Sequence, residues 1–319
     1  MRNPVVDILK GIAILLVLLG HTGLVSYDFV GRFIYSFHVP LFFIVSGYFA
    51  RSYGETLSDI RQSIIKDSKR LLLPYIATFV IIVLFTLIRT LVKHDISIVA
   101  DKSYDLFYGS TSAGPIWFLL ALFWMRTLFR PIMNVKKWAL PICIVISIIS
   151  IAIVHYITQL PFCILTAMAA MVFYAIGWYY KQYGFPAWLI LLCITCWIGM
   201  LFQPRIDIYY FNYGIYPLTI LGASGATYVL YKILQYIHGK RVIDGVLHVM
   251  QWLGVNSIVV LCFHTIDIHC CWVTMILKGL VGVELSYWPT QIIRDGFVFL
   301  FSWLYVTYLR SHILKMINL

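Results

Sequence analysis

The chain has 319 residues, of which 61% are apolar and only 12% are charged. In a typical soluble domain about a quarter of the residues are charged. The mean hydropathy of this chain is +0.88. This composition excludes a soluble globular enzyme and a disordered chain. The net charge of +11 does not indicate a nucleic-acid partner, because excess Lys and Arg in a membrane protein marks its cytoplasmic loops.

Apolar stretches long enough to cross about 30 Å of hydrocarbon as helices recur along the chain. Ten of them lie near residues 5–26, 29–50, 70–92, 115–134, 138–157, 161–180, 187–203, 213–236, 253–276 and 291–314. The first begins like a signal peptide, but no small-residue cleavage site follows it, so we expect it to be retained as a helix. The sequence therefore predicts one all-α domain over residues 1–319, a polytopic transmembrane helical bundle without a soluble domain. Its longest loops are expected near residues 51–69, 93–114 and 237–252.

The orientation of the bundle follows from the charges of its loops. With the N-terminus on the cytoplasmic side, 17 of the 24 Lys and Arg residues fall in cytoplasmic segments and seven in outer ones. Positive charge concentrates on the cytoplasmic side of membrane proteins. The sequence thus predicts that both termini are cytoplasmic, which requires an even number of helices.

Three ionisable residues share one face of the first predicted helix. Lys10 and His21 are eleven residues apart, which is about 20° beyond three full turns and about 16 Å along the axis. Asp7 lies about 60° from Lys10. Ionisable residues within spans are costly and usually functional. The alternative is that Asp7 and Lys10 are interfacial anchors and that His21 caps the outer end of the helix.

The second predicted helix contains His38 and Pro40. Proline removes a backbone hydrogen bond, so this pair predicts a distorted helix whose freed carbonyl is satisfied by protein or by a cavity. His38 is a candidate for substrate binding. The alternative is that His38 forms a hydrogen bond with a neighbouring helix and has only a structural role.

The ninth predicted helix carries the polar residues Asn256, Ser257, His264 and Asp267. Ser257 and His264 are seven residues apart and share a face, and Asp267 follows almost one turn later. His21 and Asp267 are expected at similar depths in the membrane, where a carboxylate beside the imidazole would tune its protonation. Alternatively, Asp267 belongs to the outer surface.

Two further features have both a functional and a topological interpretation. Lys66, Lys69 and Arg70 precede the third predicted helix, and such a basic cluster suits phosphate groups. The same cluster also fits cytoplasmic loop charge. Trp117 follows a Gly-Pro turn and can stack on a sugar ring, although Trp is common at membrane interfaces. The Cys193-x-x-Cys196 pair lies in an apolar segment, so we interpret it as packing and expect no metal site.

Five motifs that keep their order along the chain resemble those of the acyltransferase-3 membrane proteins, and in particular the subgroup described as fucose 4-O-acetylase-like. They are Asp7-Ile-Leu-Lys10 with Gly20-His21, Phe37-His38-Val-Pro40, Lys69-Arg70 with Pro74-Tyr75, Gly114-Pro115-Ile-Trp117-Phe118, and Asn256-Ser257 with His264. In this resemblance the basic residue and the histidine of the first helix form the main functional pair. The first position is Lys10 here, where Arg is more common.

The resemblance implies an O-acetyltransferase in the plasma or inner membrane, which uses cytoplasmic acetyl-CoA to modify a hydroxyl of a glycan or other carbohydrate. His21 would be the general base, or would carry an acetyl group, with Asp267 or His264 orienting it. The remaining roles would be donor binding by Lys10, Lys66, Lys69 and Arg70, acceptor binding by His38, Trp117, Asn256 and Ser257, and orientation of Lys10 by Asp7.

Two other functions fit the same sequence. A proton-coupled transporter or glycan flippase would use His21, His264 and Asp267 as a proton relay. A membrane sensor or scaffold would need none of these side chains for chemistry. Acyl transfer that depends on His21 distinguishes the first hypothesis from both alternatives.

Overall fold

The computed structural model of the protein describes residues 3–26, 28–51, 57–93, 111–154, 156, 161–270, 279 and 287–312. Within these ranges the regular structure is helical, and the extended pairing consists of an isolated antiparallel bridge between Asp207 and Asn212. The prediction of an all-α protein is confirmed.

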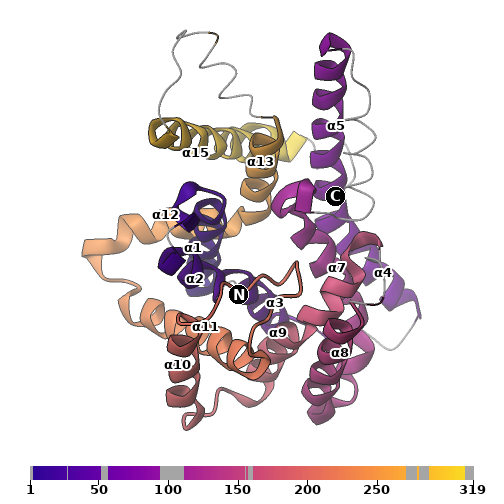
Figure 1. The fold of residues 1–319 in the computed structure, drawn as a ribbon, viewed down its shortest axis with the longest axis vertical. Coiled ribbons are helices and arrows are strands. Elements are labelled where there is room, and N and C mark those ends of the chain that lie inside the picture. The colour runs from indigo at the N-terminus through magenta and orange to yellow at the C-terminus, as the bar shows by residue number, and fades with distance from the viewer. Residues whose placement is uncertain are drawn as a thin grey trace. The chain divides into compact units, whose positions relative to one another are not determined.

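Figure 1 shows the described helices in chain order. The α-helices are α1 (Pro4–Gly20), α2 (Asp28–Tyr35), α3 (His38–Tyr48), α4 (Leu57–Asp67), α5 (Leu73–Lys93), α7 (Trp117–Met133), α8 (Ala139–Ile153), α9 (Ile164–Tyr183), α10 (Leu189–Met200), α11 (Tyr216–Ile237), α12 (Asp244–Val255), α13 (Ser257–Cys270) and α15 (Tyr287–Leu304). Short 3-10 segments are η1 (Gly23–Ser26), η3 (Thr111–Ile116), η4 (Lys136–Trp138), η5 (Pro161–Cys163) and η6 (Arg241–Ile243), and π-turns are η2 (Ser68–Leu72) and η7 (Tyr305–Leu309).

Every one of the ten predicted segments contains a helix, and several of these helices are long and apolar enough to cross a membrane. Among the described residues there are six, Asp28–Tyr48, Ser58–Leu91, Gly114–Met133, Lys136–Ile153, Pro161–Tyr183 and Tyr287–His312. The pair formed by α12 and α13 makes a seventh if it is one broken span. The protein is therefore a multi-pass membrane protein, while ten crossings with both termini cytoplasmic stay a prediction.

Two segments that were expected to be loops contain helices, so those predictions were wrong. The loop expected at 51–69 contains α4, and the loop expected at 237–252 contains most of α12. Helix α12 buries Leu247, Leu253 and Gly254, and its 12 residues are too few for the length expected of a membrane span. The helix expected over 253–276 is interrupted at Asn256. The loop expected near 93–114 lies mostly outside the described residues.

The chain divides into two compact units. Unit 1 comprises Met1–Arg61 and Ala121–Val255, and unit 2 comprises Gln62–Leu120 and Asn256–Leu319. Each unit is therefore assembled from segments far apart in the sequence. The two units are described separately below.

Unit 1 is held together by helix pairs that approach closely at glycines. Helix α1 lies along α12 (Figure 1), and a Cβ atom on Gly11 would collide with the Met250 carbonyl, as one on Gly254 would with the Asp7 carbonyl. Only glycine permits this backbone approach, which is typical of membrane helix interfaces. Helices α3 with α9, α8 with α9, and α10 with α11 form the other close pairs of this unit.

Unit 2 is organised around α13. This helix packs against α5, α15 and the turn η3, and Figure 1 shows α15 beside it. The face that it buries includes His264, Thr265 and Asp267. A polar stripe is therefore enclosed within unit 2, as expected for ionisable groups on a membrane helix.

Candidate functional site

His21 is placed by the end of α1. Asn3 begins this helix by accepting hydrogen bonds from the backbone N–H groups of Val5 and Val6, and His21 is the residue that ends it. The Nδ1 atom of His21 lies 2.8 Å from the Val17 carbonyl oxygen. A carbonyl only accepts, so Nδ1 carries the hydrogen and the lone pair of the neutral ring is on Nε2. This tautomer suits a general base.

His38 is held in the same way at the end of α2. Residues Ser36 and Phe37 form a turn between α2 and α3, and His38 Nδ1 donates to the Ile34 carbonyl at 2.7 Å. Pro40 falls in the first turn of α3, where its missing N–H costs nothing. The predicted distortion of this helix is confirmed. His38 is buried, whereas the His21 side chain is exposed.

Tyr35 joins these two helix ends. Its hydroxyl donates to the Gly20 carbonyl at 3.2 Å, and its ring meets the edge of the His38 ring at 4.9 Å between centroids. His21 and His38 interact electrostatically across the same region. The ends of α1 and α2 thus bring two imidazoles and a phenol together.

The segment between α10 and α11, here the 201–215 loop, adds charged groups to this cluster. The guanidinium carbon of Arg205 lies 4.4 Å from the centroid of the Tyr35 ring. Asp207 Oδ1 accepts backbone hydrogen bonds from Tyr209 at 3.1 Å and Tyr210 at 3.3 Å. Burial raises the pKa of the Asp207 carboxyl, while these N–H groups, Arg205 and a protonated His21 act in the opposite direction.

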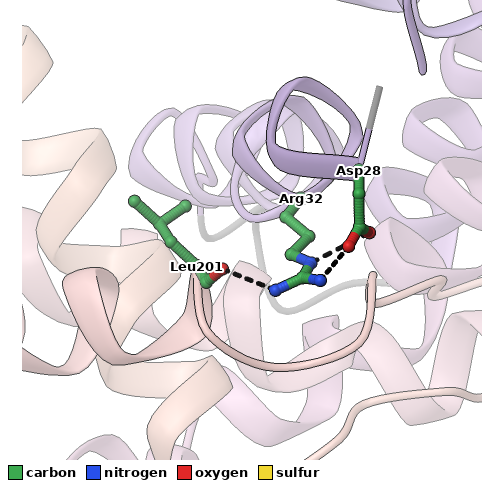
Figure 2. Close-up of polar contacts among 3 residues, drawn as sticks. All are labelled: Asp28, Arg32 and Leu201. Atoms are coloured by element: carbon green, nitrogen blue, oxygen red, sulfur yellow. Dashed lines mark hydrogen bonds and ion pairs between the residues drawn. The ribbon is translucent and has the colours of Figure 1, made fainter. Parts of the chain in front are cut away.

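The 201–215 loop is anchored to α2 at its first residue. Arg32 Nη1 donates to the Leu201 carbonyl at 3.2 Å, and Asp28 forms an ion pair with the same guanidinium (Figure 2). A second link joins the end of α2 to α10, where the Trp197 indole N–H donates to Ser36 Oγ at 3.0 Å. These bonds fix the loop beside the His21 end of α1.

Lys10 is paired within its own helix. Its Nζ lies 2.7 Å from Asp7 Oδ1, and the exposed fractions of the two side chains are 23% and 4%. The contact that Asp7 needs in order to orient Lys10, as predicted, is therefore present. Lys10 and His21 are separated along α1 by about 16 Å, with His21 at the end of the helix and Lys10 near its middle.

The basic cluster of Lys66, Lys69 and Arg70 lies in unit 2, at the junction of α4, η2 and α5, and all three side chains are exposed. Spacings of three and four residues put them on one side of the helix. Pro74 cannot donate to the Arg70 carbonyl, and the π-turn at Ser68–Leu72 accommodates this defect. Exposed cations grouped in this way fit a phosphate-bearing donor.

Asp267 and Asn256 are engaged by arginines from α15 and the helical turn that follows it. Asp267 is buried, and its Oδ2 accepts from Arg294 Nε at 2.8 Å. Asn256, also buried, accepts from Arg310 Nη1 at 3.1 Å. These contacts give α13 strong polar links to the C-terminal helix, in addition to the buried His264 that it carries.

Two other predicted substrate-binding residues occupy the ends of helices in unit 2. Trp117 begins α7 and is largely buried, directly after the turn at Gly114, whose φ is +68°. A Cβ on Gly114 would come within 3.0 Å of His269 Nε2, so this turn packs tightly on α13. Ser257 begins α13 and is partly exposed.

Residues 3–307 of the chain match the family described as acyltransferase domain. The chain belongs to the acyltransferase-3 family. No curated protein and no solved structure gives a significant match. Membership in the acyltransferase-3 family, together with the apolar helices, identifies a multi-pass membrane acyltransferase.

In this acyltransferase-3 protein the structure groups some predicted site residues and separates others into different units. His21 and His38 lie together in unit 1, which also contains the Asp7–Lys10 pair. His264, Asp267 and the basic cluster belong to unit 2, so the orientation of His21 by Asp267 or His264 stays a prediction. Within the described residues, no group of three or more His, Cys, Asp or Glu side chains is arranged to hold a metal ion.

Sequence reasoning missed Tyr35, Arg205, Asp207 and Arg294. Arg205 and Arg294 were counted only as loop charges. The stretch from Gln203 to Gly214 lies between α10 and α11. Its Asp and Asn residues are typical of a structured turn. That composition was the available signal.

Proposed function

We propose that this acyltransferase-3 protein is an O-acetyltransferase of the plasma or inner membrane, with acetyl-CoA as donor and a carbohydrate hydroxyl, such as that of a fucose-like glycan, as acceptor. The observation that carries the proposal is the tethered His21 imidazole. Its Nδ1 donates to the Val17 carbonyl, so the basic lone pair of the neutral ring is on Nε2. The family match covers this residue.

In the proposed reaction His21 Nε2 removes the proton from the acceptor hydroxyl as its oxygen attacks the thioester carbonyl. The carbon–sulfur bond then breaks, and the CoA thiolate takes the proton back from His21. An acetyl-His21 intermediate would use the same Nε2 lone pair as a nucleophile. The backbone tether to Val17 supports either route, because it holds the ring in one tautomer and limits its rotation.

Donor binding is assigned to cations. Lys66, Lys69 and Arg70 are exposed on one side of a continuous helical segment and complement the phosphate groups of acetyl-CoA. Contacts to phosphates far from the reacting carbon contribute mostly uniform binding, so Arg70→Ala should raise KM for acetyl-CoA more than it lowers kcat. Lys137→Ala, which removes another exposed cation, is the matched control.

The deciding experiment measures CoA release and acceptor acetylation by the purified protein, with mass spectrometry of the product. His21→Asn retains a short amide that can donate to Val17 but cannot act as a base, and it should lower kcat by about 10²–10⁴-fold. His248→Asn is the control, because His248 Nδ1 contacts the Asp244 carbonyl at 2.9 Å in the same i to i−4 arrangement, at an exposed position of α12. Retention of more than half the rate in His21→Asn would remove His21 as the base, and substrate transport without CoA release would favour a transporter.

A further inference from the structure

The 201–215 loop presents one exposed cation beside the His21 end of α1. Ile206, Ile208, Tyr209 and Tyr213 of this loop are buried, whereas Arg205 is exposed. Its guanidinium carbon lies over the Tyr35 ring at 4.4 Å. Within the part of the chain that the structure describes, the hydrogen-bonding groups of this guanidinium make no hydrogen bond. The five N–H donors of the Arg205 guanidinium are thus held over the face of the Tyr35 ring.

The loop does not need the Arg205 side chain for its own order. The Arg205 carbonyl accepts from Asn212 Nδ2 at 3.2 Å. The backbone bridge between Asp207 and Asn212 has N–H to carbonyl distances of 2.8 and 2.9 Å. Gln203 Oε1 also accepts from the Ile215 N–H at 3.2 Å. Backbone and amide groups close the loop, so the guanidinium is available for another role.

Tyr35 connects that guanidinium to the proposed base. The Tyr35 hydroxyl is bonded to the carbonyl of Gly20, the residue that precedes His21. Asp207, two residues after Arg205, interacts electrostatically with both Arg205 and His21. The cluster of Arg205, Asp207, Tyr35 and His21 therefore combines donors, an acceptor, an aromatic face and a base. These are the groups that bind and activate a polyhydroxylated ring.

We propose that Arg205 is an acceptor-binding residue, which donates hydrogen bonds to oxygen atoms of a carbohydrate and so positions one of its hydroxyls at His21. This inference rests on the proposed acetyltransferase function and adds the side of the site from which the acceptor approaches. Lys10 lies near the middle of α1, about 16 Å along the axis from His21. Arg205 is therefore assigned to the acceptor and not to the phosphates of the donor.

The test separates the two Michaelis constants. Methyl glycosides of a neutral 6-deoxyhexose and of a hexuronic acid serve as acceptors for the purified full-length protein, and each substrate is varied while the other is saturating. Arg205→Gln should raise KM for the acceptor roughly tenfold, the effect of losing one or two hydrogen bonds, and should leave KM for acetyl-CoA within about twofold. A larger effect on the hexuronic acid would assign the contact to its carboxylate, and an equal effect would assign it to hydroxyl oxygens.

Two further variants keep the proposal testable. Arg205→Lys retains the charge but not the planar fork of donors, so its KM for the acceptor should fall between those of wild type and Arg205→Gln. Arg241→Gln removes another exposed arginine and should change neither constant. An unchanged acceptor KM in Arg205→Gln, a rise confined to acetyl-CoA, or equal losses for both substrates with a lower melting temperature would overturn the assignment. Absence of transfer by the wild-type protein would instead reject the proposed function itself.

Discussion

The Asp7–Lys10 pair allows the structural and chemical roles of Lys10 to be separated. Lys10→Met removes the ammonium group 2.7 Å from Asp7 Oδ1 and keeps the length of the side chain. The carboxylate that loses this counter-ion is only 4% exposed. Removing one partner of a buried pair costs roughly 3–5 kcal/mol. Because Lys10 itself is 23% exposed, we expect a loss of about 3 kcal/mol, or roughly 5–10 °C in melting temperature.

The double variant Asp7→Asn/Lys10→Met removes both charges together and should recover most of that stability. If Lys10 also binds the donor, KM for acetyl-CoA stays raised in the double variant although its melting temperature is restored. The assay is a thermal melt in detergent beside steady-state kinetics of CoA release. Recovery of both stability and KM in the double variant would show that Lys10 acts only through Asp7 and would refute its assignment to the donor.

Three other substitutions test the packing and the charges. Gly254→Ala should lower the melting temperature because its Cβ would collide with the Asp7 carbonyl, whereas Gly245→Ala on the same helix meets nothing within 4 Å and should be neutral or stabilising. Burial raises the pKa of Asp207, so its contribution to stability is present below its unfolded pKa of about 4 and is lost as pH rises through the higher native value. The melting temperature of wild type should therefore fall relative to that of Asp207→Asn across that window. Arg294→Gln should destabilise unit 2 by leaving Asp267 buried without its ion pair, and a melt that Asp267→Asn/Arg294→Gln fails to recover would contradict this reasoning.

The membrane helices were predictable because their signal is local. A run of apolar residues must be helical in a bilayer, since no other single-segment structure satisfies its backbone. Helix α12 was missed because its 12 residues are fewer than the roughly 20 that a membrane span needs. Its stability comes from packing against α1, where Gly254 permits contact with the Asp7 backbone. That contact joins residues about 250 positions apart, and no local pattern encodes it.

The residues of the candidate site were likewise predicted only in part. His21 and His38 were identified from their positions in apolar helices, and the break before His38 followed from Pro40. Arg205 and Asp207 were not identified, because their proximity to Tyr35 and His21 depends on how α2 packs against the 201–215 loop. A charged loop residue such as Arg205 is already explained by membrane topology. Its sequence neighbourhood therefore does not indicate a second role in substrate binding.

The end of α1 explains why the ring of His21 is held in one orientation. At the end of α1 the backbone N–H of His21 turns to the Leu18 carbonyl at 3.0 Å, which releases the Val17 carbonyl from its usual partner in an α-helix. The imidazole of the same residue then donates to Val17 at 2.8 Å. Rotating the ring away would leave the Val17 carbonyl without this hydrogen bond, so the contact favours the observed orientation of the imidazole. The end of the helix thereby selects the Nδ1–H tautomer of His21, and the proton needed for catalysis is directed to Nε2. For this reason His21→Asn, which can still reach the Val17 carbonyl, tests the chemistry of the residue more directly than His21→Ala, which would also disturb the end of α1.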